Sequence, residues 1–590
     1  MCVPTPSRGR LPAGVPRTET TVRLPPLRLL RLSPRNQDSA RISKAQSPNH
    51  NPNRILPPMK PSATVLRLAA ITSLASLALT PGAANAGPPS PDWGVTTPVA
   101  PSPAGYINDW LRQDNPYLSS WNLGALYWGR YEIKQNGGFT GPGSLADFRT
   151  DTDNDNSYLL QRVLIRAGYT GRWFEVFAQG RSSTVTGDDR SSTGNGVTQA
   201  RTLNGVAIPA YPAASAGKGS SPESDGPMDL QQAYVFLGNH KEFPVSLKVG
   251  RQELLLGEQR IVGPLAWNNI GRQWDAAKVR WQNPYFAVEG WSSMVVMPDD
   301  NGFNRSNPDE LFSGLHLTTK AIPKTWTELY FLSRNAGRDA NAGNRGLTPA
   351  PFRPPEAQDI YTAGTYVRSS TNDWVNVDWG AQAYYQFGNF ADAREAAGMG
   401  PRREHRAWAG VISGGYTWKE SELQPRLGLE YSVASGDNNP TDGTHETFVH
   451  LYPTGHLFYG YADFASFQNL HNVRLRSSLL ATPRLRVQLE GHLKWLATAN
   501  DNFYNVAGLP RGGMTFQGAA ARGTGYGINP DAGSFVGSEI DLVATWQASK
   551  YLVLEAAYCR FLRGDYIRDS LSKVGSQDAD YVYVQAQVNF

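Results

Sequence analysis

Cysteine is almost missing from this sequence, which has two cysteines in 590 residues. Cys2 lies at the amino-terminal end, and Cys559 lies far away in a segment of alternating apolar and polar residues. A disulfide framework needs several paired cysteines, and a cysteine metal site needs several thiolates. The sequence therefore excludes both kinds of site in the chain that follows Cys2.

Long hydrophobic runs and catalytic motifs are also missing. The clearest apolar run, Leu68 to Leu79, covers 12 residues, whereas a membrane-spanning helix needs about 20. The sequence has no G-x-S-x-G motif, no Walker A loop and no dinucleotide fingerprint in a strand–helix context. His445-Glu446 with His450 misses the H-E-x-x-H spacing by one residue. We therefore expect no enzyme activity, no catalytic residue and no cofactor.

The first 86 residues have the composition of a leader. Residues 1–58 are rich in proline and arginine without apolar periodicity, which indicates a disordered or mis-assigned leader. From Met59, Lys60 and Arg67 precede the apolar run, and Ala84-Asn85-Ala86 has the A-x-A form of a cleavage site. Residues 59–86 are therefore predicted to be a secretory signal peptide that is cut near Ala86, with Met59 as the true start.

Removing this leader reverses the net charge. The whole chain has 56 basic and 51 acidic residues, and residues 1–86 hold 12 and 2 of them, which leaves 56 − 12 = 44 against 51 − 2 = 49. A net charge of 44 − 49 = −5 gives no support for nucleic-acid binding, so no nucleic-acid partner is expected.

The last eleven residues, Asp580 to Phe590, alternate strictly. Val582, Val584 and Val588 share one parity with Phe590, and tyrosine, glutamine and asparagine occupy the other parity. An extended strand with this pattern has one apolar and one polar face. Its length matches the roughly 9 to 11 residues of a tilted strand that crosses a bilayer. An aromatic last residue is typical of the strand that the barrel-assembly machinery of the outer membrane binds, and this machinery is an expected partner.

The same period-2 pattern recurs from Trp121 to the end. Short turns fall at 171–172, 239–244, 282–284, 322–324, 370–373, 419–421, 482–483 and 548–550, and longer Gly-, Asn- and Asp-rich segments lie between the hairpins. One strand on each side of every connection gives about 18 strands, with short turns at one rim and long loops at the other. A barrel of this size leaves a water-filled lumen, whereas eight strands would be filled by side chains.

The predicted fold class is therefore all-β, an antiparallel up-and-down transmembrane β-barrel with long extracellular loops and short periplasmic turns. Residues 87–116 are predicted to form a short periplasmic segment and residues 117–590 the barrel. The predicted location is the outer membrane of a Gram-negative bacterium, in contact with lipid and lipopolysaccharide, and the predicted oligomeric state is a monomer.

Cationic residues concentrate on the parity that would face the lumen. Arginine rings in a pore select anions, and the guanidinium pairs bidentately with carboxylates. The candidate pore residues on the predicted strands are Arg162, Arg166, Lys278, Arg280, Arg474, Arg476, Arg484, Arg486 and Lys494. The alternative is that these cations pair across strands with Glu132, Asp378, Glu430, Glu539 and Glu555 and stiffen the barrel.

The stretch from Gly250 to Asp275 resembles the signature region of the alginate export family of outer-membrane porins. The matching positions are Arg251, Glu253, Arg260, Trp267, Asn268, Arg272 and Asp275. The resemblance covers roughly residues 105–590. It implies an 18-stranded monomeric channel with an electropositive constriction that passes a polyuronate. Arg251, Arg260 and Arg272 then join the candidate pore residues, on a rim or on a loop that folds inward; alternatively, they pin that loop.

Asp151, Asp153 and Asp155 have the spacing that begins a calcium loop, but Asn156 and Arg162 replace its glycine and its closing glutamate. They form a weak calcium candidate, and no other metal site is predicted. The leading functional prediction is passive, anion-selective passage of an acidic polysaccharide or of small organic anions. The alternatives are a porin for another small solute and, more remotely, an outer-membrane enzyme or adhesion barrel.

Overall fold

The protein is described here from a computed structural model. The described residues are 105–112, 116–137, 148–150, 155–188, 201–203, 206–208, 223–239, 241–298, 303–337, 358–370, 373–391, 402–506, 508, 523, 525–526 and 528–590. They belong to the compact unit Ala78–Phe590. The predicted leader, the signal peptide with its cleavage site at Ala86 and the aspartates Asp151 and Asp153 lie outside the described residues.

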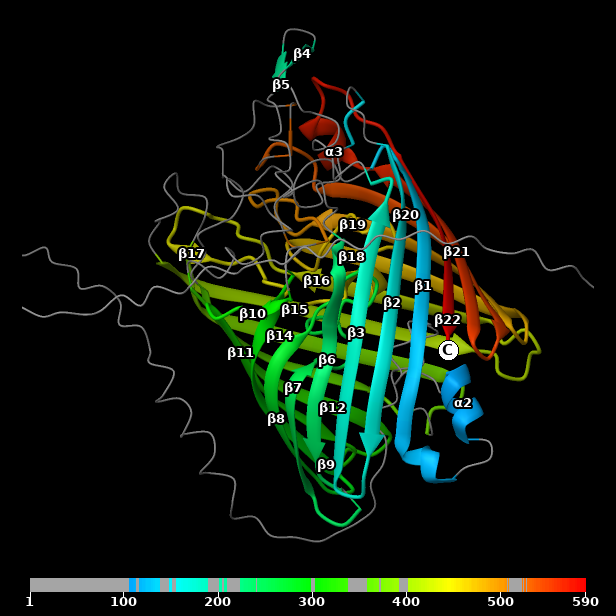
Figure 1. Cartoon of the computed structure of the whole chain (residues 1–590). Coiled ribbons are helices and arrows are strands. Elements are labelled where there is room, and N and C mark those ends of the chain that lie inside the picture. The colour runs from blue at the N-terminus through cyan, green and yellow to red at the C-terminus, as the bar shows by residue number, and fades with distance from the viewer. Residues whose placement is uncertain are drawn as a thin grey trace, which may run out of the picture. The chain divides into compact units, whose positions relative to one another are not determined.

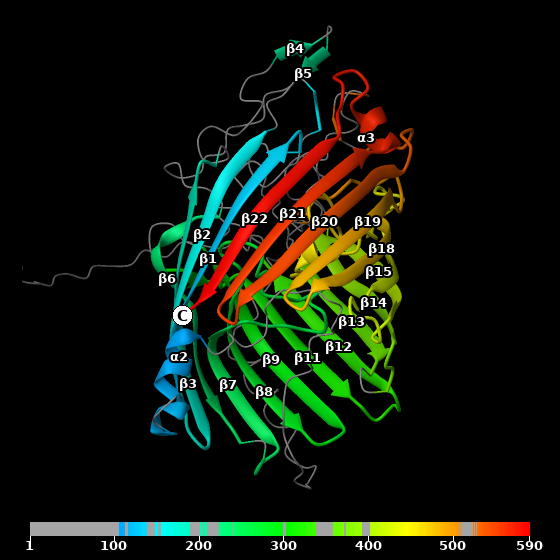
Figure 2. The ribbon, with the colours of Figure 1, turned by 90° about the vertical axis from the view of Figure 1, so that its right-hand side faces the viewer.

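Eighteen long strands form one closed antiparallel sheet (Figures 1 and 2). The sheet has 20 strands, but β10 (Arg305–Ser306) and β17 (Thr444–His445) have two residues each, so 20 − 2 = 18 strands make the wall. The wall strands are β1 (Trp121–Gln135), β2 (Asn156–Thr170), β3 (Phe174–Thr186), β6 (Asp225–Leu237), β7 (Val245–Gln252), β8 (Trp274–Gln282), β9 (Phe286–Met297), β11 (Glu310–Thr319), β12 (Thr325–Ala336), β13 (Gln358–Ser369), β14 (Val377–Ala391), β15 (Arg402–Thr417), β16 (Arg426–Ala434), β18 (Leu470–Thr482), β19 (Leu485–Leu496), β20 (Phe535–Ser549), β21 (Leu552–Arg563) and β22 (Ala579–Asn589). A separate hairpin joins β4 (Arg201–Leu203) to β5 (Val206–Ile208).

The first and last wall strands close the barrel. β1 pairs with β22 in antiparallel register from Leu126↔Asn589 to Gln135↔Asp580, and every other wall strand pairs with its neighbours along the chain. Closure leaves no unpaired edge, which a bilayer requires because its core offers no water to bind free backbone groups. The predicted fold class and the count of about 18 strands are confirmed.

The connections differ strongly between the two ends of the barrel. All eight short turns predicted from the sequence join neighbouring strands, for example at 171–173 between β2 and β3 and at 483–484 between β18 and β19. The described long connections 253–273, 435–469 and 564–578 begin at the opposite end, and the last of them contains α3 (Asp565–Ser570) (Figure 2). Strand parity and turn residues thus predicted the topology correctly.

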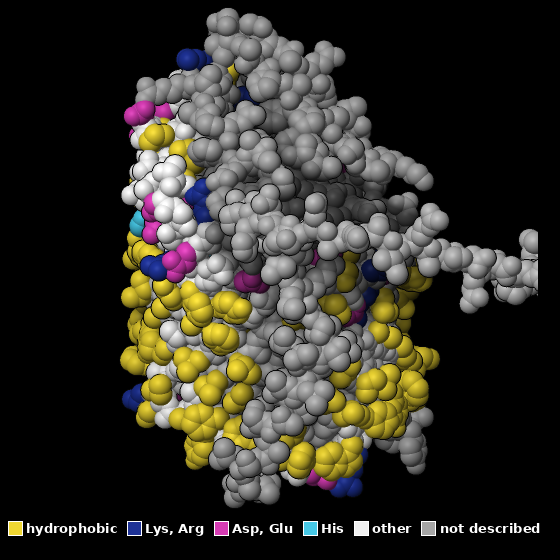
Figure 3. Space-filling view, turned by 90° about the vertical axis from the view of Figure 1, so that its left-hand side faces the viewer, with side chains coloured by type: hydrophobic (Ala, Val, Ile, Leu, Met, Phe, Trp, Pro, Cys, Tyr) yellow, Lys and Arg dark blue, Asp and Glu magenta, His cyan; other side chains and the backbone are white. Residues whose placement is uncertain are grey.

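The two faces of the strands separate as the alternation predicts. In β22, Tyr581 and Tyr583 are buried inside the barrel, whereas Val584 is 57% exposed and Phe590 is 43% exposed on the outer surface. On the face shown in Figure 3, hydrophobic side chains gather in a band, and most of the visible charged side chains lie above this band. Such a band is the surface that contacts lipid acyl chains in membrane barrels.

A short helix, α2 (Tyr106–Arg112), lies at the short-turn end beside the carboxyl terminus (Figure 2). Asn108 accepts a hydrogen bond from the backbone N–H of Leu123, and Asp109 forms an ion pair of 2.7 Å with Lys550. The 3-10 turn η1 (Pro116–Ser120) then leads into β1, and a second one, η6 (Gly455–Leu457), lies in a long loop. Among the described residues, no helix is long and apolar enough to cross a membrane.

Candidate functional site

Two long connections fold into the barrel. We call residues 253–273 the first lumen loop and residues 435–469 the second lumen loop. The first loop reaches Arg130 on β1 through Trp267 and reaches Glu430 on β16 through Arg260. It therefore extends across the interior between strands that are far apart in the wall.

Backbone hydrogen bonds join the two lumen loops. The Tyr452 N–H donates to the Ile261 carbonyl at 2.9 Å, and the Gly263 N–H donates to the Tyr452 carbonyl at 2.8 Å. The Thr454 N–H donates to the Gln259 carbonyl at 3.0 Å. These bonds form a short parallel bridge between Val262 and Tyr452, so the two loops behave as one packed body.

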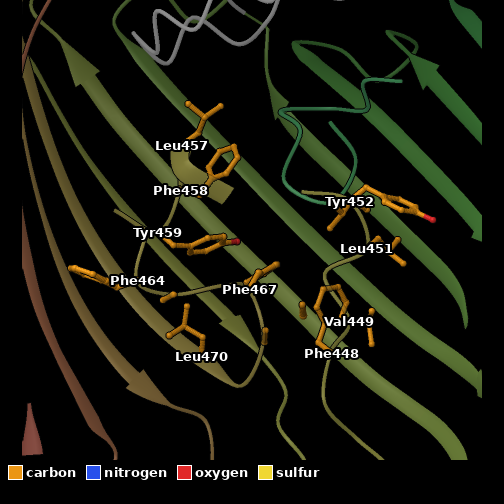
Figure 4. Packing of buried hydrophobic residues seen from close by; sticks show 14 of the residues in the cluster. Phe448, Val449, Leu451, Tyr452, Leu457, Phe458, Tyr459, Phe464, Phe467 and Leu470 are labelled. Atoms are coloured by element: carbon orange, nitrogen blue, oxygen red, sulfur yellow. The ribbon is translucent and has the colours of Figure 1, made fainter. Parts of the chain in front are cut away.

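The second lumen loop carries a hydrophobic cluster inside the barrel (Figure 4). Phe448, Tyr459 and Phe467 are almost completely buried, and the Phe467 ring lies 5.5 Å from Phe448 and 5.3 Å from Tyr459 between centroids. The residue pattern predicted an ordinary long loop in this segment and a water-filled lumen. That expectation was incomplete: aromatic side chains from the loop occupy part of the lumen. The density of Phe, Tyr and Leu between 448 and 467 was the signal that could have shown it.

Arg260 holds the first lumen loop to the wall. Its guanidinium forms ion pairs of 2.8 Å with Glu258 and 2.9 Å with Glu430, and its side chain is 1% exposed. Burial alone would lower the pKa of Arg260, but the carboxylates of Glu430 and Glu258 raise it well above its usual value. Arg260 is thus a paired, buried cation, as the loop-pinning alternative proposes.

Three arginines of the first wall strands also hold this loop, through its carbonyl oxygens. Arg130 Nη1 donates to Trp267 O at 3.0 Å, Arg162 Nη1 to Asn268 O at 3.0 Å, and Arg181 Nη1 to Ile270 O at 2.6 Å. Arg130 also pairs with Glu132 on its own strand, and Arg181 with Asp225. Arg162 pairs with no described carboxylate.

Arg272 resembles Arg162 in its partners. Its Nη1 donates to the carbonyl oxygens of Gly263 and Pro453, each at 3.3 Å, and its guanidinium lies 5.5 Å from the Tyr452 ring centroid. Among the described residues, no carboxylate forms an ion pair with it. Burial lowers the pKa of Arg272 to about 10, so the side chain remains charged at neutral pH.

The cations of β18 and β19 form a densely paired cluster. Arg474 and Arg476 lie 2.5 Å and 3.0 Å from Glu490, and Lys494 lies 2.5 Å from Glu539. All five side chains are at most 7% exposed. These cations support the alternative that charges on the inner wall pair across strands.

The remaining inward cations are less completely paired. Lys278 and Arg280 share Glu289, at 3.3 Å and 2.8 Å. Arg166 donates to the amide oxygens of Asn122 and Asn589, at 3.1 Å each. The Arg486 side chain is half-buried, and no ion pair joins it to a described residue.

The structure corrects the placement of two candidate residues. Arg251 lies at the end of β7, where its side chain is mostly buried, pairs with Asp275 at 2.9 Å and donates to Asn304 O at 3.1 Å, so it holds the segment before β10 and not the first lumen loop. Arg484 lies in the turn between β18 and β19, is exposed and donates to Ala548 O at 3.4 Å. A register shift at Leu480/Thr482 ends the alternation before that turn.

The other signature residues contact partners outside the first lumen loop. Glu253 accepts a hydrogen bond from Gln231 at 3.3 Å, and Asn268 donates to Glu223 at 2.7 Å. The Trp267 ring stacks on the His456 ring of the second loop, with 3.7 Å between centroids. The Arg130 guanidinium lies 3.5 Å from the Trp267 ring centroid. Of the calcium candidates, Asp155 is described and accepts a hydrogen bond from the Asn136 N–H.

Solved barrel structures are similar at low sequence identity. OccK9 (OpdG) of Pseudomonas aeruginosa has 12% identity, with 80% of this chain and 98% of that chain covered and a TM-score of 0.47. OccD3 (OpdP) of the same organism has 10% identity, 80% and 91% coverage and a TM-score of 0.45. A BenF-like porin of Pseudomonas fluorescens has 11% identity, 80% and 99% coverage and a TM-score of 0.44. None of the curated proteins matches this chain.

A family model described as "Alginate export" matches residues 121–579. The match begins at the first residue of β1 and ends at the first residue of β22, so it covers nearly the whole wall and both lumen loops. The resemblance found in the sequence is confirmed. The chain belongs to the alginate export family and has the closed 18-stranded barrel of an outer-membrane channel.

Proposed function

We propose that this protein is a passive, anion-selective channel that passes an acidic polysaccharide, such as an alginate-like polyuronate, or small organic anions. The observation that carries the proposal is the set of partners of Arg162 and Arg272. Both guanidinium groups bind neutral carbonyl oxygens of the lumen loops, and neither pairs with a described carboxylate. Carboxylates act on them only from beyond ion-pair distance, Glu253 and Glu223 on Arg162 and Glu310 on Arg272.

Carbonyl partners orient a guanidinium without neutralising it. Arginine has five N–H donors, and Arg162 Nε is buried without a hydrogen-bond partner in the described part of the chain. A carboxylate that approaches such a group gains a charge-assisted hydrogen bond, and the low dielectric of the interior strengthens the attraction. A uronate residue carries such a carboxylate.

A second group of cations lies on the wall nearer the short-turn end. Lys248 and Lys278 are register partners on β7 and β8, and Arg280 lies two residues after Lys278, around the shared carboxylate of Glu289. Arg486 lies close to the short-turn end of β19. Successive cationic positions let a polyanion move from one to the next without one tight site that would hold it. The proposed route therefore needs no catalytic step.

The outer surface of the barrel indicates which molecules the proposed channel would contact. The hydrophobic band would contact acyl chains of lipid and lipopolysaccharide in the outer membrane of a Gram-negative bacterium, and β22 with Phe590 would be the strand that the barrel-assembly machinery binds. Closure of β1 on β22 within one chain completes the barrel without a second copy, which supports a monomer.

Single-channel recording tests the proposal. Protein purified from outer membranes is placed in a planar bilayer, the reversal potential is measured in a salt gradient, and an oligouronate is then added. We expect anion selectivity and a block by the oligouronate but not by a neutral oligosaccharide of the same length. Arg272→Ala and Arg486→Ala should weaken both effects, whereas Arg484→Ala, which removes an exposed turn arginine, should leave them unchanged.

Three results would contradict the proposal. Cation selectivity would show that the acids, and not the arginines bound to carbonyl oxygens, set the electrostatic potential in the lumen. An anion-selective current that is indifferent to the oligouronate would identify a porin for another small solute. No current under any condition would show that the lumen loops close the barrel.

A further inference from the structure

We propose that Glu490, His492 and Asp541 form a binding site for a divalent transition-metal ion such as Zn²⁺ on the inner wall. One donor atom from each of these residues lies within 4.8 Å of the other two, and all three side chains are buried. They come from adjacent strands, since Glu490 is the register partner of Asp541 in the pairing of β19 with β20. The site is separate from the arginines of the proposed anion route.

The surroundings of His492 point to a ligand. Its Nδ1 lies 3.1 Å from the Oδ1 of Asn472, which can only accept a hydrogen bond. In the tautomer that donates this bond, Nε2 carries a lone pair. Nε2 is buried without a hydrogen-bond partner in the described structure, and it faces Glu490 Oε2 at 3.5 Å and Asp541 Oδ2 at 3.7 Å. Three lone-pair donors therefore lie close enough together to bind one ion.

The distances between these donors suit a small metal ion. Separations of 3.5 Å and 3.7 Å are too long for good hydrogen bonds. Ligands about 2.0–2.2 Å from a tetrahedral zinc ion are separated by roughly 3.4 Å. An imidazole nitrogen with two carboxylate oxygens favours zinc and its neighbours in the first transition row over calcium or magnesium. A water molecule would supply the fourth ligand.

The local charge also allows a divalent ion. The cations that act on the cluster from neighbouring strands are Arg474, Arg476 and Lys494, and the acids are Glu490, Glu539 and Asp541. Three cations against three acids give 3 − 3 = 0 with His492 neutral. Asp541 is the acid in this group that has no arginine or lysine in ion-pair contact among the described residues. A metal ion would neutralise it.

Glu490 would share its Oε2 between a metal ion and Arg474. This oxygen accepts a hydrogen bond from Arg474 Nε at 2.6 Å and lies 2.5 Å from Arg474 Nη2, so an ion would replace one of these two contacts. Asp541 Oδ2 accepts a hydrogen bond from the Tyr461 N–H at 3.4 Å, and Oδ1 is buried without a hydrogen-bond partner in the described structure. Asn472 would fix the His492 ring from outside, as partners of metal-binding histidines commonly do.

Zinc titration of the purified full chain, without a histidine tag, tests the site. We expect one Zn²⁺ bound per chain, with affinity about 100-fold weaker in His492→Gln and Asp541→Asn and about 10-fold weaker in Asn472→Ala. His405→Gln and His471→Gln are matched histidine controls on neighbouring parts of the wall and should bind zinc like the parent protein. His405 is the more stringent control, because it lies 2.9 Å from a second histidine, His445, and this pair is the competing candidate for zinc binding.

X-ray absorption of the zinc-loaded parent protein gives an answer that does not depend on how the variants fold. One nitrogen and two protein oxygen ligands at about 2.0–2.2 Å would support the site. Two or more histidine ligands, or loss of binding in His405→Gln alone, would overturn it in favour of the His405–His445 pair. Absence of zinc binding by the folded parent would show that a proton, and not a metal ion, lies between His492 and Asp541.

Discussion

The Arg260 guanidinium lies 2.9 Å from the Glu430 carboxylate, and this ion pair joins the first lumen loop to β16. Both side chains are at most 11% exposed. Because Glu258 also pairs with Arg260, a single guanidinium compensates two carboxylates inside the barrel. This contact fixes where the loop narrows the lumen.

Replacing this cation should release the loop. Arg260→Met leaves Glu258 and Glu430 without their cation, and removing one partner of a buried ion pair costs about 3–5 kcal/mol. We expect a loss of this order in the free energy of unfolding, measured by urea titration in lipid vesicles. Single-channel recordings should show larger and less steady currents.

The control for this prediction is an exposed pair on the same barrel. Arg406 and Glu404 lie 2.7 Å apart but are 58% and 55% exposed, so Arg406→Met should leave the unfolding free energy nearly unchanged. The double variant Arg260→Met with Glu430→Gln should recover part of the loss. Equal effects of the two single variants would contradict the role given to Arg260.

The aromatic cluster should determine how fully the lumen is occupied. Phe467 is completely buried between Phe448 and Tyr459, and a Phe→Ala change in a core typically costs about 3–5 kcal/mol. We expect Phe467→Ala to destabilise the protein by an amount of this order and to raise the conductance. Leu429→Ala, on the outer face where Leu429 is 58% exposed, should leave the conductance unchanged. An unchanged conductance in Phe467→Ala would show that the cluster does not limit the current.

Glu253 should make stability depend on pH. Burial raises the pKa of the Glu253 carboxyl, and its hydrogen bond from Gln231 and the charges of Arg162 and Lys248 oppose this effect. The folded state then holds the proton more tightly than the unfolded chain, so the unfolding free energy falls as pH rises from the unfolded pKa, about 4.3, through the raised folded value. Glu253→Gln should abolish this fall, as measured by urea unfolding across that pH range. A fall of the same size in the variant would assign it to another group.

Gly105 allows α2 to approach the end of β22. A Cβ atom at this position would lie 2.1 Å from the backbone oxygen of Phe590, whereas a Cβ at Gly491 on β19 would meet nothing within 4 Å. Gly105→Ala should displace α2 and increase proteolytic cleavage near residue 110, and Gly491→Ala should not. Equal resistance of both variants to proteolytic cleavage would show that the position of α2 does not depend on this contact.

The strands of the wall could be predicted from the sequence because the alternation of their side chains arises within each strand. Side chains of a strand alternate between two faces, and lipid outside with water inside makes this alternation visible in residues such as Val584 and Tyr583. Turn residues then divided the chain into 18 strands without information about distant contacts. Arg484 was misplaced because a register shift interrupts the period before the turn.

The sequence by itself thus determined the barrel, the order of its strands and the identity of most charges that face inward. The tertiary structure alone decided which of these charges are neutralised. Arg474 meets Glu490 across two strands and Arg260 meets Glu430 across 170 residues of chain, while Arg162 and Arg272 meet carbonyl oxygens of loops that fold back into the lumen. Such pairings depend on distances between segments far apart in the chain, which periodicity does not encode.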